Sequence, residues 1–544
     1  MKVLVGGAWE NKFLDYHRGP NEYRVQVLFW KNLERPQGLY FIRGNSPRLL
    51  WNYLWEIGLR QVWRKVLSRT EERRRNEKYV ACGVGRVLDT PPCSVCQAGD
   101  LVVFLAPSHP TCVERIVVPT ELLRQIGADA SPPTPGNEIW CLAEPQQEET
   151  QDPWWKPLRG WSPHSGATLE STLYSSLLER AAQAIRQADW AKARRLDISG
   201  TMEVCERSGR EAEPTKAGKK TGVLMGYGNY AKVVILPNIS PYVEVKCIHE
   251  LDPMQMPHAS NPAIVWDASP ELRPEERYDV VLIAGYHHTH APLAAAALKR
   301  GAYAVVEKPM VTDAGQLRML LQALQDSPGK LFCGFHKRYS PLNPLALEDL
   351  DSGPGTPISY HCIVYEVPLP PMHWYRWPNS HSRLASNGCH WIDHFLYLNG
   401  FCEPTSWDLT LAADGAINCS ISLANGAFFT MVLTDQGSER IGMQEYVELR
   451  ANEVTVKIEN SGRYLSEGKD RILRRTRVNK MLSYERMYTE IGREIATGGL
   501  GDSAASVETS AGLVLKLEDR LVELQGRREQ KGEYPVALAD FERF

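Results

Sequence analysis

Two groups of side chains in this sequence could carry chemistry. Lys308 follows the apolar run AYAVVE, and an ammonium at a strand end can hydrogen-bond the oxygen or nitrogen on a reacting carbon. His390 and Asp393 lie in CHWIDHFLYL, a pattern that predicts a helix on which they share one face. A histidine titrates near neutral pH and can act as general acid or base, with Asp393 orienting it or binding substrate. The alternatives are a surface lysine and a His–Asp pair that is satisfied without catalytic duty.

A glycine turn upstream has the pattern of a cofactor-binding loop. G-x-G-x-x-A, at residues 226–231, follows the apolar stretch 223–225. The first glycine permits a sharp turn, the second lets the backbone approach a pyrophosphate, and the alanine lets the next helix pack closely on the strand. The N-terminus of that helix would face the phosphates. We therefore predict dinucleotide binding rather than a plain glycine turn, through Gly226, Tyr227, Gly228, Asn229 and Tyr230.

The second strand of this unit ends in an acidic residue, Glu250. A carboxylate there can accept hydrogen bonds from both ribose hydroxyls, and it would repel a 2′-phosphate. The sequence therefore favours NAD as the cofactor, with NADP less favoured.

Four motifs together resemble the glucose–fructose oxidoreductase and inositol dehydrogenase family (Gfo/Idh/MocA). They are the glycine turn, EKP at 307–309, GFHKRYSP at 334–341 and HWID at 390–393. The resemblance covers about residues 220–544. It implies a doubly wound Rossmann sheet followed by an α+β domain with an open antiparallel sheet. It also implies that Lys308 handles the proton in catalysis, and it adds Gly285, His287, His290 and Glu307 as residues near the cofactor.

The sequence departs from this family just before His390. Sugar dehydrogenases of the family usually carry an Asp at the position where this chain has Ser386, so the expected lysine–aspartate–histidine relay is incomplete. This leaves room for reduction of a carbonyl or imine instead of simple polyol oxidation. The candidates for substrate binding are Arg338, Trp374, Arg383 and Ser386.

The first part of the chain shows another resemblance. YVACGVGRVLD, the Gly99–Asp100 turn and a V-V-P strand end resemble the GroES-like domain of medium-chain dehydrogenases. Neither a following glycine fingerprint nor the usual zinc-ligand Gly-His-Glu run is present before residue 221. This half is therefore interpreted as a remnant that lost its cofactor domain and its metal. Cys93 and Cys96 form a C-x-x-C without a second half, which favours ordinary cysteines over zinc, and we predict no metal.

The predicted organisation has four parts. Residues 1–130 are the GroES-like remnant, 131–220 a helical segment and linker, 221–345 the Rossmann domain, and 346–544 the antiparallel-sheet substrate domain with C-terminal helices. Within them, an amphipathic helix is expected at 173–195 and further helices at about 482–497 and 503–526. Strands are expected at 357–367, 406–412, 417–424, 427–434, 446–451 and 453–458.

Composition limits the classes of partner. The 544 residues carry a formal net charge of −3, which gives no general attraction to nucleic acid or an anionic membrane. No apolar run of membrane-spanning length and no signal peptide is visible, so we expect a cytoplasmic protein. A basic stretch at 60–78 could bind an acidic partner or a carrier protein, although a solvated helix face is favoured. The resemblance also implies a homo-oligomer formed through the antiparallel sheet.

These patterns predict an NAD(P)-dependent oxidoreductase that moves hydride between nicotinamide and a sugar-type or other small polar substrate. The alternative within the same class is an imine or carbonyl reductase in natural-product biosynthesis. The alternative outside it is a dehydrogenase-derived scaffold that binds a dinucleotide and turns nothing over.

Overall fold

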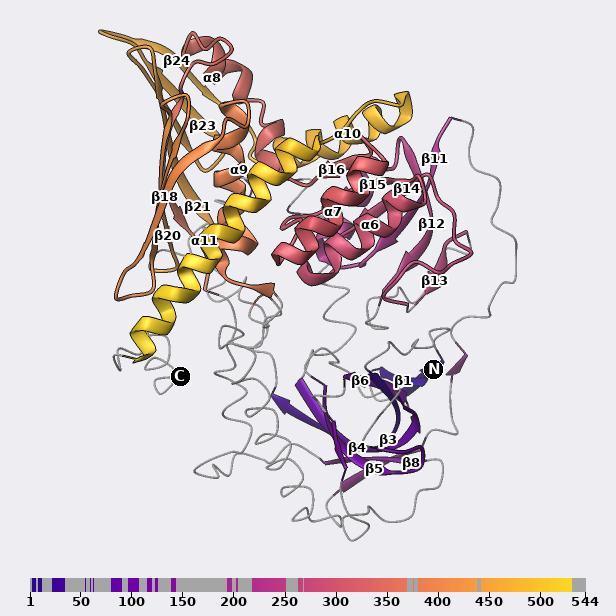
Figure 1. Cartoon of the computed structure of the whole chain (residues 1–544). Helices are drawn as coiled ribbons and strands as arrows, with labels where there is room; N and C mark the ends of the chain where they lie inside the picture. The colour runs from indigo at the N-terminus through magenta and orange to yellow at the C-terminus, as the bar shows by residue number, and fades with distance from the viewer. Residues whose placement is uncertain are drawn as a thin grey trace. The chain divides into compact units, whose positions relative to one another are not determined.

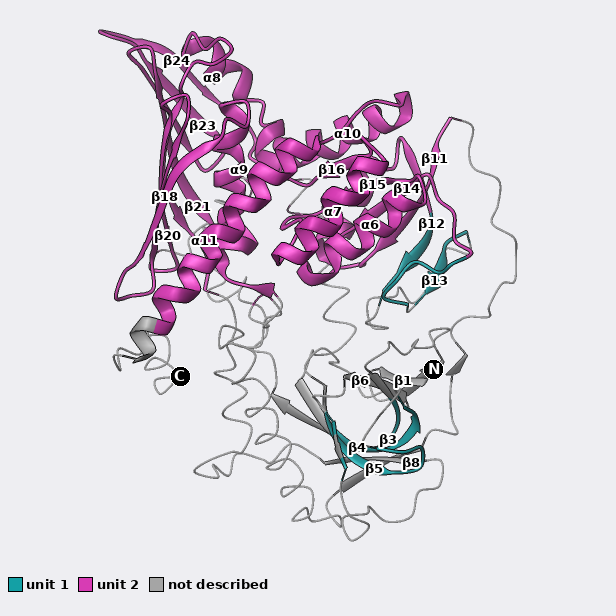
Figure 2. Ribbon diagram, in the orientation of Figure 1, with its two compact units in different colours: residues 1–43, 68–214, 246–274 teal, residues 44–67, 215–245, 275–544 magenta. Residues whose placement is uncertain are grey.

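The computed structural model divides the chain into two compact units (Figure 2). Residues 1–43, 68–214 and 246–274 form one unit, and residues 44–67, 215–245 and 275–544 form the other. From residue 218 onward the structure describes 218–250, 263–267, 269–368, 375, 380–437 and 442–530. Before that it describes mainly strands, at 2–5, 8–11, 22–34, 80–90, 96–106, 115–119, 123–125, 138–142, 193–197 and 202–203, with single positions at 54, 59 and 62.

The first unit is built on β-strands. Its larger sheet has the order β7-β5-β4-β3-β8-β9, with β6 also pairing β3. The strands are β3 Glu22–Glu34, β4 Val80–Asp89, β5 Leu101–Ala106, β6 Arg115–Pro119, β7 Leu123–Gln125, β8 Glu138–Leu142 and β9 Ala193–Asp197. A smaller sheet joins β1 Lys2–Val5, β2 Ala8–Asn11 and β10 Met202–Glu203.

The predicted Gly99–Asp100 turn joins β4 to β5. Gly99 has φ +97°, where a side chain would be strained, and the amide N–H of Asp100 donates to Gln97 O at 3.1 Å. Strands β4, β5 and β6 lie within the stretch that resembles a GroES-like domain. The helix expected at 173–195 does not reach its predicted end, because residues 193–195 begin β9 and pair antiparallel with β8. Residues 173–192 lie outside the described residues.

The parallel sheet predicted around the glycine turn is confirmed. Its order is β13-β12-β11-β14-β15-β16, and the pairs β12–β13, β11–β14, β14–β15 and β15–β16 are parallel (Figure 1). Every residue of β14 is buried, as expected for a strand covered on both faces. Ligands of such sheets bind at the carboxyl ends of the strands. The elements are β11 Lys220–Met225, β12 Val243–His249, β13 Val265–Asp267, β14 Val280–Ile283, α6 His290–Lys299, β15 Tyr303–Val306, α7 Ala314–Asp326 and β16 Leu331–Cys333.

The largest sheet of the chain's described part, formed by residues of the second unit, has the order β18-β19-β20-β17-β21-β22-β23-β24. All its pairings are antiparallel except β17 with β20, which is parallel, so the sheet is mixed rather than purely antiparallel as predicted. The six predicted strands are confirmed, and β23 and β24 are additional. The bounds are β17 Ser359–Tyr365, β18 Pro404–Leu411, β19 Ile417–Leu423, β20 Phe428–Thr434, β21 Gln444–Ala451, β22 Val454–Glu459, β23 Arg463–Glu467 and β24 Ile472–Arg477.

Helices cover one face of the mixed sheet and join it to the parallel sheet. α9 (Cys389–Leu398) packs on β17, and α11 (Ala504–Gln530) packs on β18, α9 and α7 (Figure 1). α10 (Leu482–Thr497) packs against the helix that follows the glycine turn, and the short helix α8 (Asn343–Asp349) contacts β22. The alternation of buried and part-exposed residues along β19 gives the sheet one covered face. These contacts fix the position of α9, which carries His390.

Candidate active site

The glycine turn has the geometry that a pyrophosphate requires. Gly226 has φ +95°, and a Cβ there would lie 2.8 Å from the carbonyl oxygen of Ala284, so only glycine fits. A Cβ on Gly228 would meet nothing within 4 Å, which leaves open space beside the start of the helix. Asn229, at that start, is exposed. The residues present therefore fit a bound dinucleotide.

A wide helical turn follows. Residues Ala231–Ile235 form a π-helix and Leu236–Ile239 continue as α5. Pro237 has no N–H to donate one turn back, and the N–H of Leu236 donates to Ala231 O, five residues earlier. The carbonyl of Gly228 accepts from the N–H of Lys232 at 3.1 Å, so the helix begins directly at the turn. Lys232 also places its ammonium 4.6 Å from the Tyr227 ring centre.

Two of the predicted cofactor residues, Tyr230 and Glu307, contact tyrosines of α10. The carboxylate of Glu307, which is 8% exposed, accepts a hydrogen bond from the hydroxyl of Tyr488 on α10. The ring of Tyr230 lies 6.4 Å from that of Tyr488 and 6.3 Å from that of Tyr484. Burial raises the pKa of Glu307, and burial together with the Glu307 charge raises the pKa of Tyr230. The cluster ties the glycine turn and the end of β15 to α10.

Lys308 lies at the carboxyl end of β15 with an acceptor for each of its protons. Its Nζ donates to Ser386 O at 2.8 Å, to Asn387 Oδ1 at 3.1 Å and to the Tyr375 hydroxyl at 3.4 Å. Burial acts to lower the pKa of Lys308, but the neighbouring Tyr375, Cys389 and Glu307 outweigh it and the pKa is raised. The side chain therefore remains an ammonium ion at neutral pH.

Ser386 lies in a second π-helical turn, which is formed by Leu384–Gly388. The N–H of Cys389 donates to Leu384 O, five residues earlier, and such wide turns are frequent at functional sites. Ser386 is 2% exposed and meets Lys308 through its main-chain carbonyl. The residue beside it, Asn387, supplies the side-chain acceptor. Sequence reasoning missed Asn387, although a polar amide next to the lost Asp was a usable signal.

Asn387 connects Lys308 to a row of charged side chains, Glu366, Arg383 and Asp435. Its Nδ2 donates to the carboxylate of Glu366, which is 6% exposed and whose pKa is raised by burial. The guanidinium of Arg383 lies 3.8 Å from Glu366 and 2.5 Å from Asp435. Arg383, a predicted substrate-binding residue, is thus held between two carboxylates with its side chain 28% exposed.

His390 is a buried imidazole beside Lys308 and a second histidine. It is 5% exposed, its ring centre lies 4.6 Å from that of His336, and its Nδ1 has no hydrogen-bond partner among the described residues. Burial, followed by the nearby His336 and Lys308, holds the pKa of His390 well below its usual range. The ring is therefore neutral at physiological pH, and one of its nitrogens is a hydrogen-bond acceptor.

Asp393 and Arg338 bind each other. The guanidinium of Arg338 makes two hydrogen bonds with Asp393, at 2.5 and 2.8 Å, and also pairs with Asp502. Ser510 donates to the same Asp393 carboxylate at 2.8 Å. Asp393 is fully buried, and Arg338 leaves only 9% of its side chain exposed. These contacts hold α9 in position, and the predicted roles of Asp393 in catalysis and of Arg338 in substrate binding stay predictions.

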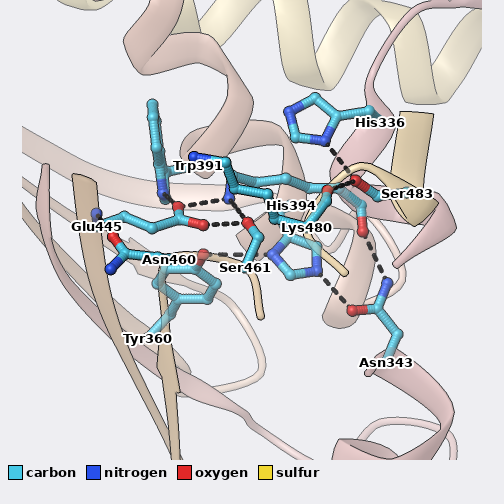
Figure 3. A network of polar contacts seen from close by, with 11 residues as sticks. His336, Asn343, Tyr360, Trp391, His394, Glu445, Asn460, Ser461, Lys480 and Ser483 are labelled. Carbon is cyan, nitrogen blue, oxygen red and sulfur yellow. Dashed lines mark hydrogen bonds and ion pairs between the residues drawn. The ribbon is translucent and has the colours of Figure 1, made fainter. Parts of the chain in front are cut away.

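A second polar network holds the opposite side of α9 (Figure 3). Lys337 forms a buried ion pair with Glu445 at 2.5 Å, and the indole N–H of Trp391 donates to the same carboxylate at 2.5 Å. His394 hydrogen-bonds Asn343 at 3.0 Å and the hydroxyl of Tyr360 at 3.2 Å. With the Arg338 pair, these contacts fix the direction of His390.

The remaining predicted residues lie as follows. Gly285 follows β14, and the N–H of the preceding Ala284 donates to Met225 O at 2.9 Å. His287 hydrogen-bonds Ser380 O at 3.2 Å and its ring lies 4.7 Å from that of Tyr375. His290 bonds Pro309 O at 2.8 Å. Glu250 directly follows β12. Trp374 and the basic stretch at 60–78, apart from its position 62, lie outside the described residues.

These features fit a bound dinucleotide next to a buried lysine and a buried histidine. Comparison with known proteins agrees. Residues 221–335 match the model of the GFO/IDH/MocA family, an oxidoreductase family with an NAD-binding Rossmann fold. This part of the chain therefore resembles the NAD-binding domain of that family.

Two curated relatives share the same region. The uncharacterized oxidoreductase YdgJ of Escherichia coli is 34% identical over 118 residues, which are 21% of this chain and 34% of YdgJ. The putative oxidoreductase YteT of Bacillus subtilis is 34% identical over 77 residues, 14% of this chain and 18% of YteT. The chain thus matches about a third or less of the length of these relatives. A dehydrogenase from Chromobacterium violaceum, 16% identical, covers 58% of this chain and 98% of its own with a TM-score of 0.49.

Proposed function

We propose that the protein is an NAD-dependent oxidoreductase acting on a sugar-type or other small polar substrate. The observation that carries the proposal is the combination in one unit of a pyrophosphate-compatible turn at Gly226 and Gly228 with Lys308 and His390. Hydride exchange with a substrate carbon is the chemistry that NAD supplies when bound.

The side chains of this protein would bind the substrate and move its proton. The Tyr375 hydroxyl is the most distant acceptor of Lys308, at 3.4 Å, so a substrate oxygen can replace it without disturbing Ser386 and Asn387. The ammonium would then orient that oxygen and stabilise negative charge on it. The neutral His390 ring would accept the proton during oxidation and return it during reduction.

One observation favours reduction of a carbonyl or imine over oxidation of an alcohol. Lys308 is bound directly by a main-chain carbonyl, an amide and a phenol, where the relatives of this family usually place an aspartate. An ammonium whose direct contacts are neutral stabilises developing charge on a substrate oxygen more strongly than one paired with a carboxylate. We keep this reductase as the second candidate function.

Two further properties are proposals on the same footing. The N-terminal sheet would be a GroES-like remnant, supported by β4, the Gly99 turn and β5 in the predicted order. The mixed sheet would form a homo-oligomer contact, supported by Ile363 and Tyr446, which lie opposite each other and are 53% and 52% exposed.

Within the part of the chain that the structure describes, no helix is long and apolar enough to cross a membrane.

The test is single-turnover hydride transfer with NAD⁺ and a panel of polyols, and with NADH and a panel of carbonyl and imine compounds. Lys308→Ala and His390→Ala should each lower the rate by about 10²–10⁴-fold while NADH affinity changes little. A matched control is Lys330→Ala, whose ammonium donates to Gly301 O on the surface. Wild-type rates in both alanine variants, or no turnover by the wild type in any panel, would favour the non-catalytic scaffold.

A further inference from the structure

We propose that His336 selects substrates that carry a hydroxyl group beside the reacting carbon, by accepting a hydrogen bond at its Nε2 atom. The inference rests on the proposed function and names its substrate class. His336 lies in GFHKRYSP but was not among the residues predicted from sequence to form the site.

The fold places the His336 ring in the site and holds it there. His336 begins a short 3-10 helix, His336–Tyr339, just after β16, and is 3% exposed. Tyr484 of α10 stacks on the ring with centres 3.8 Å apart and planes 17° apart. The ring of His390 packs against it with ring centres 4.6 Å apart and planes 68° apart. An imidazole fixed in this way presents its nitrogens in set directions.

The neighbouring hydroxyl assigns the tautomer. Ser483 donates to the carbonyl of Lys480 at 3.3 Å, so its oxygen is left to accept from His336 Nδ1, 3.1 Å away (Figure 3). Nδ1 then carries the proton and Nε2 is a bare acceptor. Nε2 is buried and has no hydrogen-bond partner among the described residues. The opposite tautomer would bury an unpaired N–H, which is the rarer and costlier arrangement.

The surroundings define what Nε2 would bind. Burial, followed by the charges of Lys337 and Lys308, keeps the pKa of His336 well below its usual range, so the ring stays neutral. A neutral acceptor near two ammonium groups favours an uncharged donor over a cationic one. A substrate hydroxyl meets this requirement, and an ether or a methyl group at the same place would leave Nε2 unsatisfied, which costs affinity.

Nitrogen-15 NMR of histidine-labelled full-length protein, loaded with NAD⁺, tests the tautomer and the donor together. The His336 signals are identified by their loss in His336→Phe. We expect a protonated Nδ1 and an unprotonated Nε2 at neutral pH. Glycerol and sorbitol should shift the Nε2 signal, and 1,2-dimethoxyethane, which offers acceptors only, should not. A proton on Nε2 would overturn the proposal, as would equal shifts with the ether or no shift with either polyol.

Substitutions separate the hydrogen bond from packing. His336→Phe keeps an aromatic ring against Tyr484 without the acceptor and should weaken sorbitol binding about fivefold, as expected for one net hydrogen bond. His336→Gln restores an acceptor and should recover most of the affinity. The control is His288→Phe, since His288 stacks on Tyr286 6.2 Å away, outside this cluster. Equal affinities in the Phe and Gln variants would contradict the inference. NADH titration of each sample shows separately whether the dinucleotide site itself is intact.

Discussion

Replacing Arg338 tests whether its ion pairs hold α9 in place. Arg338→Met removes the guanidinium that pairs with Asp393 and Asp502, leaving two carboxylates that are 0% and 10% exposed without a cation. Breaking a buried pair by removing one partner typically costs about 3–5 kcal/mol. We expect a loss of that order in the free energy of unfolding, measured by urea denaturation at pH 8.

The same variant predicts a specific pH dependence. Burial raises the pKa of Asp393 even though Arg338 opposes it, and loss of Arg338 should raise that pKa further. A carboxyl group whose folded pKa is raised binds its proton more tightly in the folded state, so its destabilising effect fades as pH falls through that pKa. The deficit of Arg338→Met should therefore be smaller at pH 5 than at pH 8.

Two comparisons make the result decisive. Arg463→Met removes an exposed ion pair with Glu459, and should cost less than about 1 kcal/mol. The double variant Arg338→Met with Asp393→Leu removes both partners and should recover part of the loss. A cost for Arg338→Met below about 1 kcal/mol, or a deficit that grows toward pH 5, would refute the assignment of this pair as a buried clamp on α9.

Two further predictions concern acid and the cofactor. Burial lowers the pKa of His287, His290, His336, His390 and His394, that of His290 to about 4, so below about pH 6.5 the unfolded chain binds protons that the folded chain does not. Stability should therefore fall as pH drops from about 7 to 5, by up to about 1.4 kcal/mol per pH unit for each histidine, and urea midpoints that do not change over this range would contradict this. For the cofactor, the Glu250 carboxylate should make NADH bind at least about tenfold tighter than NADPH in fluorescence titrations. Glu250→Ala should reduce this difference in affinity. A preference for NADPH would show that Glu250 does not contact the ribose.

Local patterns in the sequence were enough to predict the elements that carry the site. The strand–turn–helix at 220–239 could be predicted from two glycines and an alanine, and the helix predicted at about 482–497 is α10. β24 was missed, because most of ILRRTR is exposed and shows no apolar alternation. Local patterns also could not predict which side chains contact each other within the site. Arg338 meets Asp502, and His336 meets Ser483, across more than a hundred residues of chain.

Ser386 shows where a motif comparison needs the structure. The sequence identifies a lost aspartate, and this alone implies a broken proton relay. The backbone instead widens into a π-helical turn that offers Lys308 the Ser386 carbonyl, and Asn387 supplies the side chain. Backbone hydrogen bonding of this kind depends on helix geometry, which side-chain identity does not reveal.

NADH binding by paired glycine variants tests the central claim most directly. A Cβ on Gly228 and a Cβ on Gly353 would each meet nothing within 4 Å, so an arginine at either position should fold. Only Gly228 adjoins the predicted pyrophosphate site. In fluorescence titrations, Gly228→Arg should lose NADH binding by more than about tenfold, and Gly353→Arg should bind like the wild type. Equal affinity in Gly228→Arg and the wild type would contradict the assignment of this turn as the dinucleotide site.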